Sequence, residues 1–521
     1  MLSTLIWAPI LGVALIGLYP QLSPQRARQI ALIVSSAVLA WTLYLLTQFS
    51  ASTVGLQLQE SLPWIETLGL SYQLGVDGLS LPLVVVNSLL VWIAIYSSDS
   101  NINRPRLYYS LMLVLGSAVA GAFVAQNLLL FFIFYELELI PLYLLIAIWG
   151  GAKRGYAATK FLIYTAASGV LLLAGFFGLS FLSGTFSFDY DVLLAHSLPM
   201  VTQIVLLTII VIGFGIKIPL VPFHTWLPDA HVEASTPTSV LLAGVLLKLG
   251  TYGLLRFGLQ LFPDAWNVIA PWLAVVATVN VLYGSFVAIA QTDMKKIVAY
   301  SSIGHMGFVI LALAAATPLG LLGAVMQMVS HGLISALLFL LVGVVYSKTG
   351  TRDVNILSGL LTPERGLPLI GTLMIAGAMA SGGTPGMVGF IAEFIVYRGS
   401  FSVFPVETLL CMIGTGLTAV YFLNLINRTF FGRLTERLAN LPPVYWRDRI
   451  PSIIVTLLVI CFGIQPAWMT RWIESTTTVL GIDMITRGAT VSQDVVTQPV
   501  AEVPLAFQVY TAPALPTAEL R

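Results

Sequence analysis

The chain has 521 residues, of which 58% are hydrophobic and 9% charged, and its mean hydropathy is +0.92. This balance is too apolar for a soluble globular protein of such length, so we expect the membrane to be its solvent. A formal net charge of +1 provides no basic field, which excludes nucleic acid as a partner. Cys411 and Cys461 lie outside any Cys-x-x-Cys or Cys/His pattern, so we expect no metal or iron–sulfur cluster on this chain.

Long apolar stretches follow one another from the N-terminus almost to the end of the chain. With about 20 residues per crossing, they predict an all-α polytopic fold of about 14 transmembrane helices. We expect these helices to be centred near Leu11, Val38, Ser88, Val114, Leu139, Leu171, Ile209, Gly244, Ala277, Ala312, Ile334, Ile375, Leu417 and Leu457. The first has no basic region or cleavage signature and is expected to be retained.

The same pattern predicts how the chain is organised. Residues 1–98 form three N-terminal helices, 107–258 and 267–431 form two repeats, 448–470 form the last helix, and 487–521 form a polar tail without helical period. Most of the 24 lysines and arginines fall in the connections that follow odd-numbered spans, with pairs such as Arg26 and Arg28 or Lys153 and Arg154. The positive-inside rule therefore predicts both termini on the side away from the cytoplasm or stroma.

Four ionisable residues stand at membrane depth: Glu136, Lys217, Lys248 and Glu393. A lone charge at mid-bilayer costs at least about 2.5–3.5 kcal/mol, and such groups usually line a polar path. Glu138 is less informative, because it lies about 200° around a continuous helix from Glu136. The alternative is a set of static buried ion pairs.

Three histidines add to the predicted path: His224, His305 and His331. Imidazole suits proton handover near neutral pH, and His224 is our candidate for proton entry. Single helical histidines are also common as satisfied core residues. A metal site at His224, Asp229, His231 and Glu233 is not expected, because their spacing matches no metal motif.

Glycine and proline interrupt two of the predicted spans beside a charge. Gly213, Gly215, Pro219 and Pro222 surround Lys217, while Gly382, Gly383, Pro385 and Gly386 precede Glu393. Such residues break the backbone ladder. The two spans are five apart and cross in opposite directions, as in an inverted repeat in which helices 4–8 are mirrored by helices 9–13.

Five stretches of the sequence carry a family resemblance. They are YELELIPLYLLIAIWGG, RGYAATKFLIYTAASG, KIPLVPFHTWLPDAHVEASTPTSVLLAGVLLKLGTYGLLR, DMKKIVAYSSIGHMGF and GTPGMVGFIAEF. Between about Leu79 and Phe431 the chain resembles the antiporter-like subunits of complex I. It is most similar to the D-type subunit, chain 4, of the cyanobacterial and plastid photosynthetic form. The family is related to subunits of Mrp-type cation/proton antiporters.

The resemblance implies a role for each charged position. Glu136 and Lys217 match the family's ion pair, Lys248 its central lysine, His305 and His331 its bridging histidines, and Glu393 its terminal acid. Opening of the pair would push a proton from Lys217 to Lys248, and then through His305 and His331 to Glu393. The resemblance also implies that the fused lateral helix known in the family is not expected on this chain.

The resemblance also implies a setting. It places the chain in the thylakoid membrane with both termini in the lumen, among lipid and the other membrane subunits of the complex. Plastoquinone and the iron–sulfur clusters would belong to other subunits of this NAD(P)H- or ferredoxin-dependent oxidoreductase. The opening LIWAPILGVALIGLYPQLSPQRARQIAL resembles paralogues in carbon dioxide uptake complexes, whose uptake proteins would then be partners. The respiratory and cyclic-flow form, an Mrp-type antiporter subunit and a non-conducting scaffold stay open as alternatives.

Overall fold

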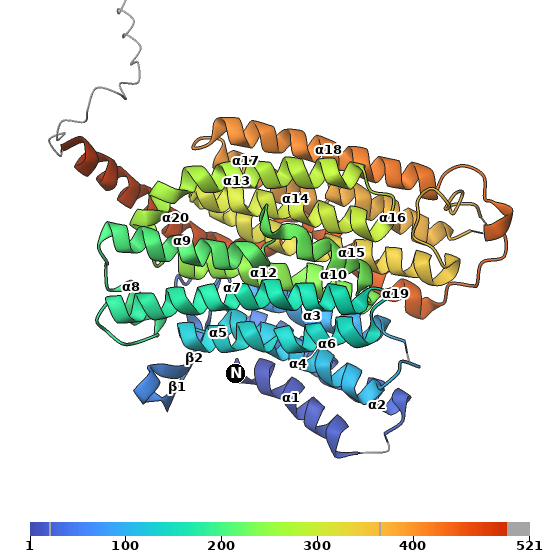
Figure 1. The fold of residues 1–521 in the computed structure, drawn as a ribbon, viewed down its shortest axis with the longest axis horizontal. Helices are drawn as coiled ribbons and strands as arrows, with labels where there is room; N and C mark the ends of the chain where they lie inside the picture. The colour runs from blue at the N-terminus through green and yellow to red at the C-terminus, as the bar shows by residue number, and fades with distance from the viewer. Residues whose placement is uncertain (20–21, 100, 364–365, 498–521) are drawn as a thin grey trace, which may run out of the picture.

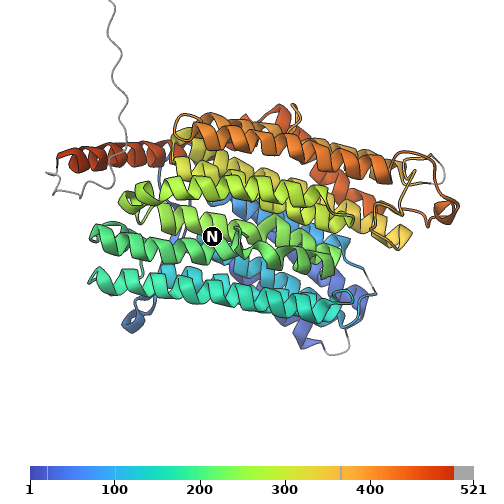
Figure 2. The same ribbon diagram turned by 45° about the horizontal axis from the view of Figure 1, so that its top comes forward.

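The computed structural model describes residues 1–19, 22–99, 101–363 and 366–497. Its helices run nearly parallel along one axis of the molecule and form a single bundle (Figures 1 and 2). The first half contains α1 (Ser3–Leu18), α2 (Pro24–Gln48), α3 (Leu81–Ser97), α4 (Pro105–Val124), α5 (Leu128–Leu137), α6 (Leu139–Trp149), α7 (Arg154–Leu182), α8 (Tyr190–Leu194), α9 (Met200–Lys217), α10 (Trp226–Glu233), α11 (Thr236–Leu241) and α12 (Leu247–Gly253).

The helices of the second half of the chain belong to the same bundle and run along the same axis. It contains α13 (Pro263–Ile289), α14 (Met294–Ala315), α15 (Pro318–Thr349), α16 (Pro368–Ser381), α17 (Val388–Ser400), α18 (Pro405–Thr429), α19 (Trp446–Ile464) and α20 (Ala467–Thr497). Two π-helical segments, η3 (Leu242–Leu246) and η4 (Leu254–Leu259), interleave with α12. Three single 3-10 turns complete the described helices: η1 (Glu66–Leu68), η2 (Phe223–Thr225) and η5 (Glu436–Leu438).

The prediction of a polytopic helical membrane protein is confirmed. Within the described ranges, ten helical segments are long and apolar enough to cross a membrane, and α19 and α20 together form an eleventh that bends by 65°. Three further apolar helices, α1, α3 and α16, are shorter than these spans. Every predicted centre lies in one of these helices, while the total of 14 crossings stays a prediction.

The connections separate into two ends of the bundle. The turns between α1 and α2, between α15 and α16 and between α18 and α19 lie at one end, on the right in Figure 1, which we call the basic end because it carries the predicted lysine and arginine clusters. The opposite end carries the α7–α9 connection and a β-hairpin, and we call it the acidic end. Which end faces the lumen stays a prediction.

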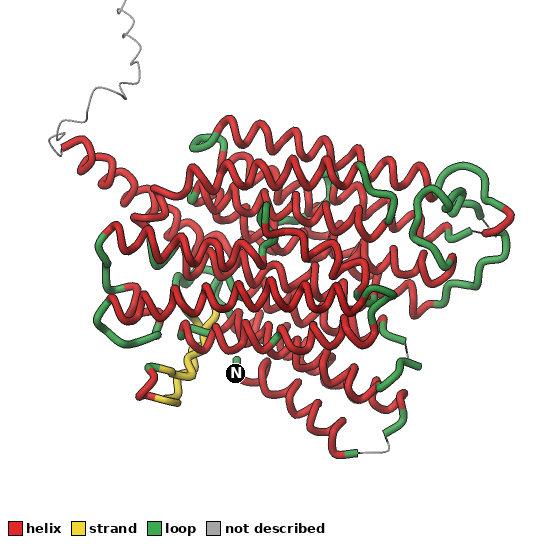
Figure 3. Tube along the Cα trace, in the orientation of Figure 1, coloured by secondary structure: helices red, strands yellow, loops and turns green. Residues whose placement is uncertain are grey.

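One small sheet, yellow in Figure 3, interrupts the helical order between α2 and α3. The antiparallel strands β1 (Gln57–Ile65) and β2 (Leu70–Val76) are joined through η1 and Gly69. Gly69 has φ +63°, a left-handed conformation that glycine adopts without steric cost. Sequence reasoning treated this stretch only as a long connection and did not predict the hairpin.

Both predicted helix interruptions are present. Helix α9 ends at Lys217, and the chain turns through Pro219 before α10 begins at Trp226. Helix α16 ends at Ser381, and Gly383 and Gly386 adopt positive φ angles before α17 begins at Val388. The inverted relation of the two repeats stays a prediction.

The C-terminal region differs from expectation. Helix α20 continues to Thr497, so residues 487–497 are helical rather than part of a tail without helical period. The first proline after Arg487 is Pro499, so no backbone donor is lost before that point. Figure 2 shows α20 extending past the neighbouring helices. The remaining predicted tail lies outside the described residues.

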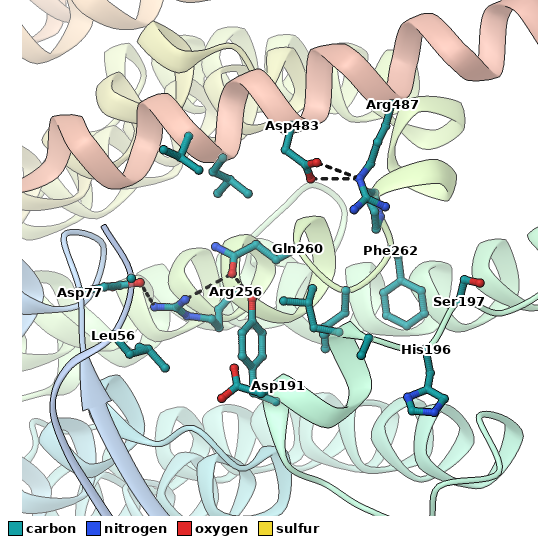
Figure 4. A pocket seen from close by; sticks show the side chains of 18 of the residues that line it. Leu56, Asp77, Asp191, His196, Ser197, Arg256, Gln260, Phe262, Asp483 and Arg487 are labelled. Carbon is teal, nitrogen blue, oxygen red and sulfur yellow. Dashed lines mark hydrogen bonds and ion pairs between the residues drawn. The ribbon is translucent and has the colours of Figure 1, made fainter. Parts of the chain in front are cut away.

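A pocket of about 720 Å³ opens at the acidic end between the hairpin region, η4 and α20 (Figure 4). Arg256 lies on its wall, is only 3% exposed, and donates to Asp77 Oδ2 at 2.5 Å and to Gln260 Oε1 at 3.2 Å. Asp77 precedes α3, so this buried ion pair connects the start of the third span to the end of the eighth.

We expect Asp77→Asn to destabilise the protein, because Arg256 would remain buried without a counter-charge. Breaking a buried pair in this way costs about 3–5 kcal/mol. The matched control is Asp483→Asn, which removes an exposed pair with Arg487 worth at most about 1 kcal/mol. The unfolding temperature and yield of the purified protein should fall for the first variant only. Equal values for both would contradict this assignment.

Candidate functional site

A buried ion pair joins the first broken helix to the fifth span. The Lys217 ammonium pairs with the Glu138 carboxylate, and the two side chains are 1% and 0% exposed. The ammonium also lies 3.4 Å from the centre of the Tyr135 ring and 3.4 Å from the Tyr135 carbonyl oxygen. A carboxylate, an aromatic face and a carbonyl together replace the water that an ammonium would otherwise require.

The predicted pair of Lys217 with Glu136 is therefore corrected: the observed partner is Glu138. The prediction treated residues 136 and 138 as members of one continuous helix. Pro141 has no N–H and cannot bond the carbonyl of Leu137, so α5 ends at Leu137 and α6 begins at Leu139. Glu138 occupies the break, and its side chain is no longer constrained to the face opposite Glu136.

Lys248 lies at the centre of the bundle, on a span whose helix is buried along its whole length. Its ammonium donates to the Ala243 carbonyl at 2.6 Å and meets His331 Nδ1 at 2.7 Å. The wide turn of η3 leaves the carbonyl five residues back accessible to this lysine. A Cβ on Gly332 would lie 2.9 Å from the Gly244 carbonyl, so glycine at position 332 allows α15 to approach η3 closely enough for the contact.

His305 and Glu393 form the next contact in the row. His305 Nδ1 lies 3.4 Å from Glu393 Oε1, and its Nε2 lies 2.9 Å from Ser381 Oγ at the end of α16. Glu393 Oε2 accepts from Thr415 at 2.7 Å and from Tyr397 at 3.4 Å. The break between α16 and α17 thus brings a serine and the carboxylate to the same imidazole.

The two histidines link these groups. Their ring centres are 5.5 Å apart, and with Ser381 and Glu393 they line a cavity of about 10 Å³. Gln327 Oε1, Ser330 Oγ and His331 Nε2 also lie at this cavity and have no hydrogen-bond partner within the described residues. A polar cavity of this size with three unpaired groups suits about one water molecule.

The structure therefore brings four of the predicted residues into one row, in the order Lys248, His331, His305 and Glu393. The expected order of the histidines was the reverse and is corrected, because α15 rather than α14 carries the partner of Lys248. In the described part of the chain no hydrogen bond or ion pair joins Lys217 to Lys248. Their helices nevertheless touch, since a Cβ on Gly250 would lie 2.7 Å from Ile218 Cγ1.

His224 and Glu136 lie outside this row. His224 is buried on η2, and its Nε2 lies 3.1 Å from the Tyr283 hydroxyl. Glu136 is half-buried, and its carboxylate lies against Gly169 on α7. No group of three or more His, Cys, Asp or Glu side chains with metal-binding geometry occurs among the described residues.

Comparisons with known proteins match this architecture to one family. The model of the NADH:quinone oxidoreductase/Mrp antiporter transmembrane family matches residues 125–418, more than half of the chain. The chain belongs to this family. Antiporter-family members similar to it include NAD(P)H-quinone oxidoreductase chain 4 3 of Trichormus variabilis, 41% identical over all of this chain and 97% of that protein. Chain 4-2 of Synechocystis is 43% identical over 85% of this chain and 79% of that protein.

Solved structures of antiporter-family proteins show the same fold. A chain of respiratory complex I from Thermus thermophilus superimposes with a TM-score of 0.85 at 26% identity, covering 93% of this chain and all of that one. A chain of the Mrp complex from Dietzia gives a TM-score of 0.82 at 19% identity, covering 94% of this chain and 99% of that one.

Sequence reasoning missed several polar partners of this antiporter-family site. Tyr397 follows Glu393 by one helical turn, a spacing that predicts proximity. Thr415 and Ser381 come from other helices, and no local pattern indicates their contacts. Lys295 is also buried, and its ammonium donates to Ala234 O at 2.6 Å and to Ser239 Oγ at 3.2 Å.

We expect Glu393→Gln to slow proton transfer at least about tenfold, because an amide at this position cannot accept a proton from His305 as a carboxylate can. The matched control is Glu407→Gln, which changes a partly exposed carboxylate in the first turn of α18. Both variants are compared by proton uptake into vesicles that contain the whole complex. Wild-type uptake by the Glu393 variant would remove this residue from the path.

Proposed function

We propose that this chain is the proton-translocating membrane subunit of a photosynthetic complex I. The complex couples plastoquinone reduction to proton pumping across the thylakoid membrane and acts as an NAD(P)H- or ferredoxin–plastoquinone oxidoreductase. This chain conducts protons, while plastoquinone and the iron–sulfur clusters belong to other subunits. The relatives named NAD(P)H-quinone oxidoreductase chain 4, which align over the full length, support this assignment.

The observation that carries the proposal is the row from Lys248 to Glu393. Lys248 touches His331, the two imidazoles are neighbours, and His305 touches Glu393. All four residues are buried, with at most 5% of their surface exposed. A static structural role needs only paired charges, whereas this row places four proton-carrying groups in sequence across one half of the bundle.

The ion pair at Lys217 supplies the coupling step. Opening this pair removes the counter-charge of the ammonium and drives its proton towards Lys248, through His331 and His305, and out by Glu393. A contact pair at an effective dielectric near 20 is worth about 4 kcal/mol. Moving one charge against about 150–200 mV costs about 3.5–4.6 kcal/mol. One pair can therefore nearly drive one proton.

The proposal extends to the setting of the chain. Both termini face the lumen, His224 at the α9–α10 break takes up protons, and the partners are neighbouring antiporter-like subunits and lipid. Mass spectrometry of the purified complex distinguishes its forms. Co-purifying carbon dioxide hydration proteins identify the uptake form, and their absence identifies the respiratory and cyclic-flow form.

An Mrp-type cation/proton antiporter subunit is the second candidate. The matching family model covers both kinds of protein, and the Dietzia Mrp chain has the same fold. Sodium-dependent proton exchange in the absence of any electron donor favours this function. Proton uptake that requires electron transfer to plastoquinone favours the complex I subunit.

We expect Lys248→Met to abolish proton transfer through this chain, because the apolar side chain fills the space but carries no proton. The matched control is Lys296→Met, at the first turn of α14 near the basic end. Protons taken up per electron are measured in vesicles containing the assembled complex. A wild-type ratio in the Lys248 variant would support the scaffold alternative and contradict the proposed function.

A further inference from the structure

Two carboxylates lie at the break between α5 and α6, Glu136 near the end of α5 and Glu138 in the break itself, and Lys217 pairs with only one of them. Glu138 is fully buried, and one of its oxygens pairs with Lys217 while Oε2 has no hydrogen-bond partner in the described ranges. Glu136 stands two residues earlier, is half-buried, and no hydrogen bond or ion pair to a described residue involves it. The site therefore holds one ammonium and two acids.

The Glu136 carboxylate packs against one particular residue of a neighbouring helix. Its carboxylate lies directly on Gly169 of α7, where an added Cβ would be 2.6 Å from Glu136 Cδ. Any larger residue at position 169 would displace the carboxylate. The preceding residue, Ser168, accepts a 2.8 Å hydrogen bond from the Tyr135 hydroxyl and donates to the Gly213 carbonyl on α9. Adjacent residues of α7 thus position both Glu136 and its neighbour Tyr135.

Tyr135 contacts the Lys217 ammonium and directly precedes Glu136 in the chain. Lys217 Nζ lies over the ring of Tyr135 and within 3.4 Å of its carbonyl oxygen, immediately before Glu136 in the chain. An ammonium over an aromatic face keeps part of its stabilisation while it changes its anionic partner. Lys217 is the last residue of α9. Its long side chain therefore extends from the end of a helix, where the regular backbone stops.

We propose that Lys217 exchanges between two carboxylates, an inner position at Glu138 and an outer position at Glu136, and that Glu138 binds a proton each time the ammonium leaves it. This proposal rests on the proposed function and adds Glu138 as a further residue of the proton path. The resemblance pairs Lys217 with Glu136 alone, whereas the sequence YELEL provides two acids.

The charges balance in each half of the exchange. When the ammonium moves to Glu136, the buried Glu138 carboxylate loses its counter-charge and takes one proton that enters from the uptake side, proposed above at His224. The positive charge of the ammonium leaves Glu138, and the positive charge of the proton replaces it. When the ammonium returns, that proton is expelled towards Lys248. In this form of the coupling step the transferred proton is the one bound by Glu138, and Lys217 stays protonated throughout. A buried carboxylate without a partner is otherwise too costly to persist.

Gly169→Ala tests the exchange without changing any charged residue. The added methyl group displaces the Glu136 carboxylate, while Lys217 keeps its observed partner Glu138. Gly175→Ala on the same helix is the matched control, because its Cβ would lie 2.7 Å from Ile210 Cγ1, an apolar contact. We expect the protons taken up per electron to fall to the Lys248→Met value in Gly169→Ala and to stay at the wild-type value in Gly175→Ala.

Glu138→Gln provides the second arm and a spectroscopic readout. We expect Glu138→Gln to lower the number of protons taken up per electron to the Lys248→Met value. We also expect it to remove an infrared difference signal of carboxyl protonation that the wild type shows during turnover. A purely structural pair would give no such signal in the wild type. If Lys248→Met abolishes proton transfer but Glu138→Gln and Gly169→Ala pump normally, the exchange is wrong while the proposed function stands. If Lys248→Met also pumps normally, the proposed function itself fails.

Discussion

The constraint on which this structure depends is the cost of a charge in a medium without water. Each ammonium and carboxylate at membrane depth must find an opposite charge, a hydrogen bond or a polar cavity inside the bundle. Lys217 finds Glu138 and the face of Tyr135, Lys248 finds a carbonyl and His331, and Glu393 finds His305 and two hydroxyl groups. The three most deeply buried spans carry Lys248, His305 and His331, whereas the span that ends at Lys217 is only half-buried.

Local defects in helices create the partners that the charges need. A proline after Glu138 separates α5 from α6, and a second break follows Lys217. The π-helical turn before Lys248 provides a carbonyl, and the glycine-rich gap before α17 brings Ser381 to His305. Regular helices would bond all these backbone groups internally. The fold therefore places its irregular backbone where ionisable side chains are found.

Much of this arrangement was predictable because it is encoded locally. Hydrophobic length located the helices, and charged residues within apolar runs located Lys217, Lys248 and Glu393. The choice of Glu138 over Glu136 was missed because helical geometry was extended across Pro141. The contacts of Thr415 and Ser381 depend on packing between distant segments, which one sequence does not reveal. The hydrophobic pattern also did not predict the hairpin between α2 and α3 or the continuation of α20.

The most direct test of the central claim is a high-resolution cryo-EM map of the assembled complex in a lipid environment. The proposed path predicts ordered water density between Lys217 and Lys248 and in the cavity between His331 and Glu393. Together with the side chains, this water would form a connected polar row through the subunit. Tightly packed apolar side chains in both places, without water density, would contradict proton conduction by this chain.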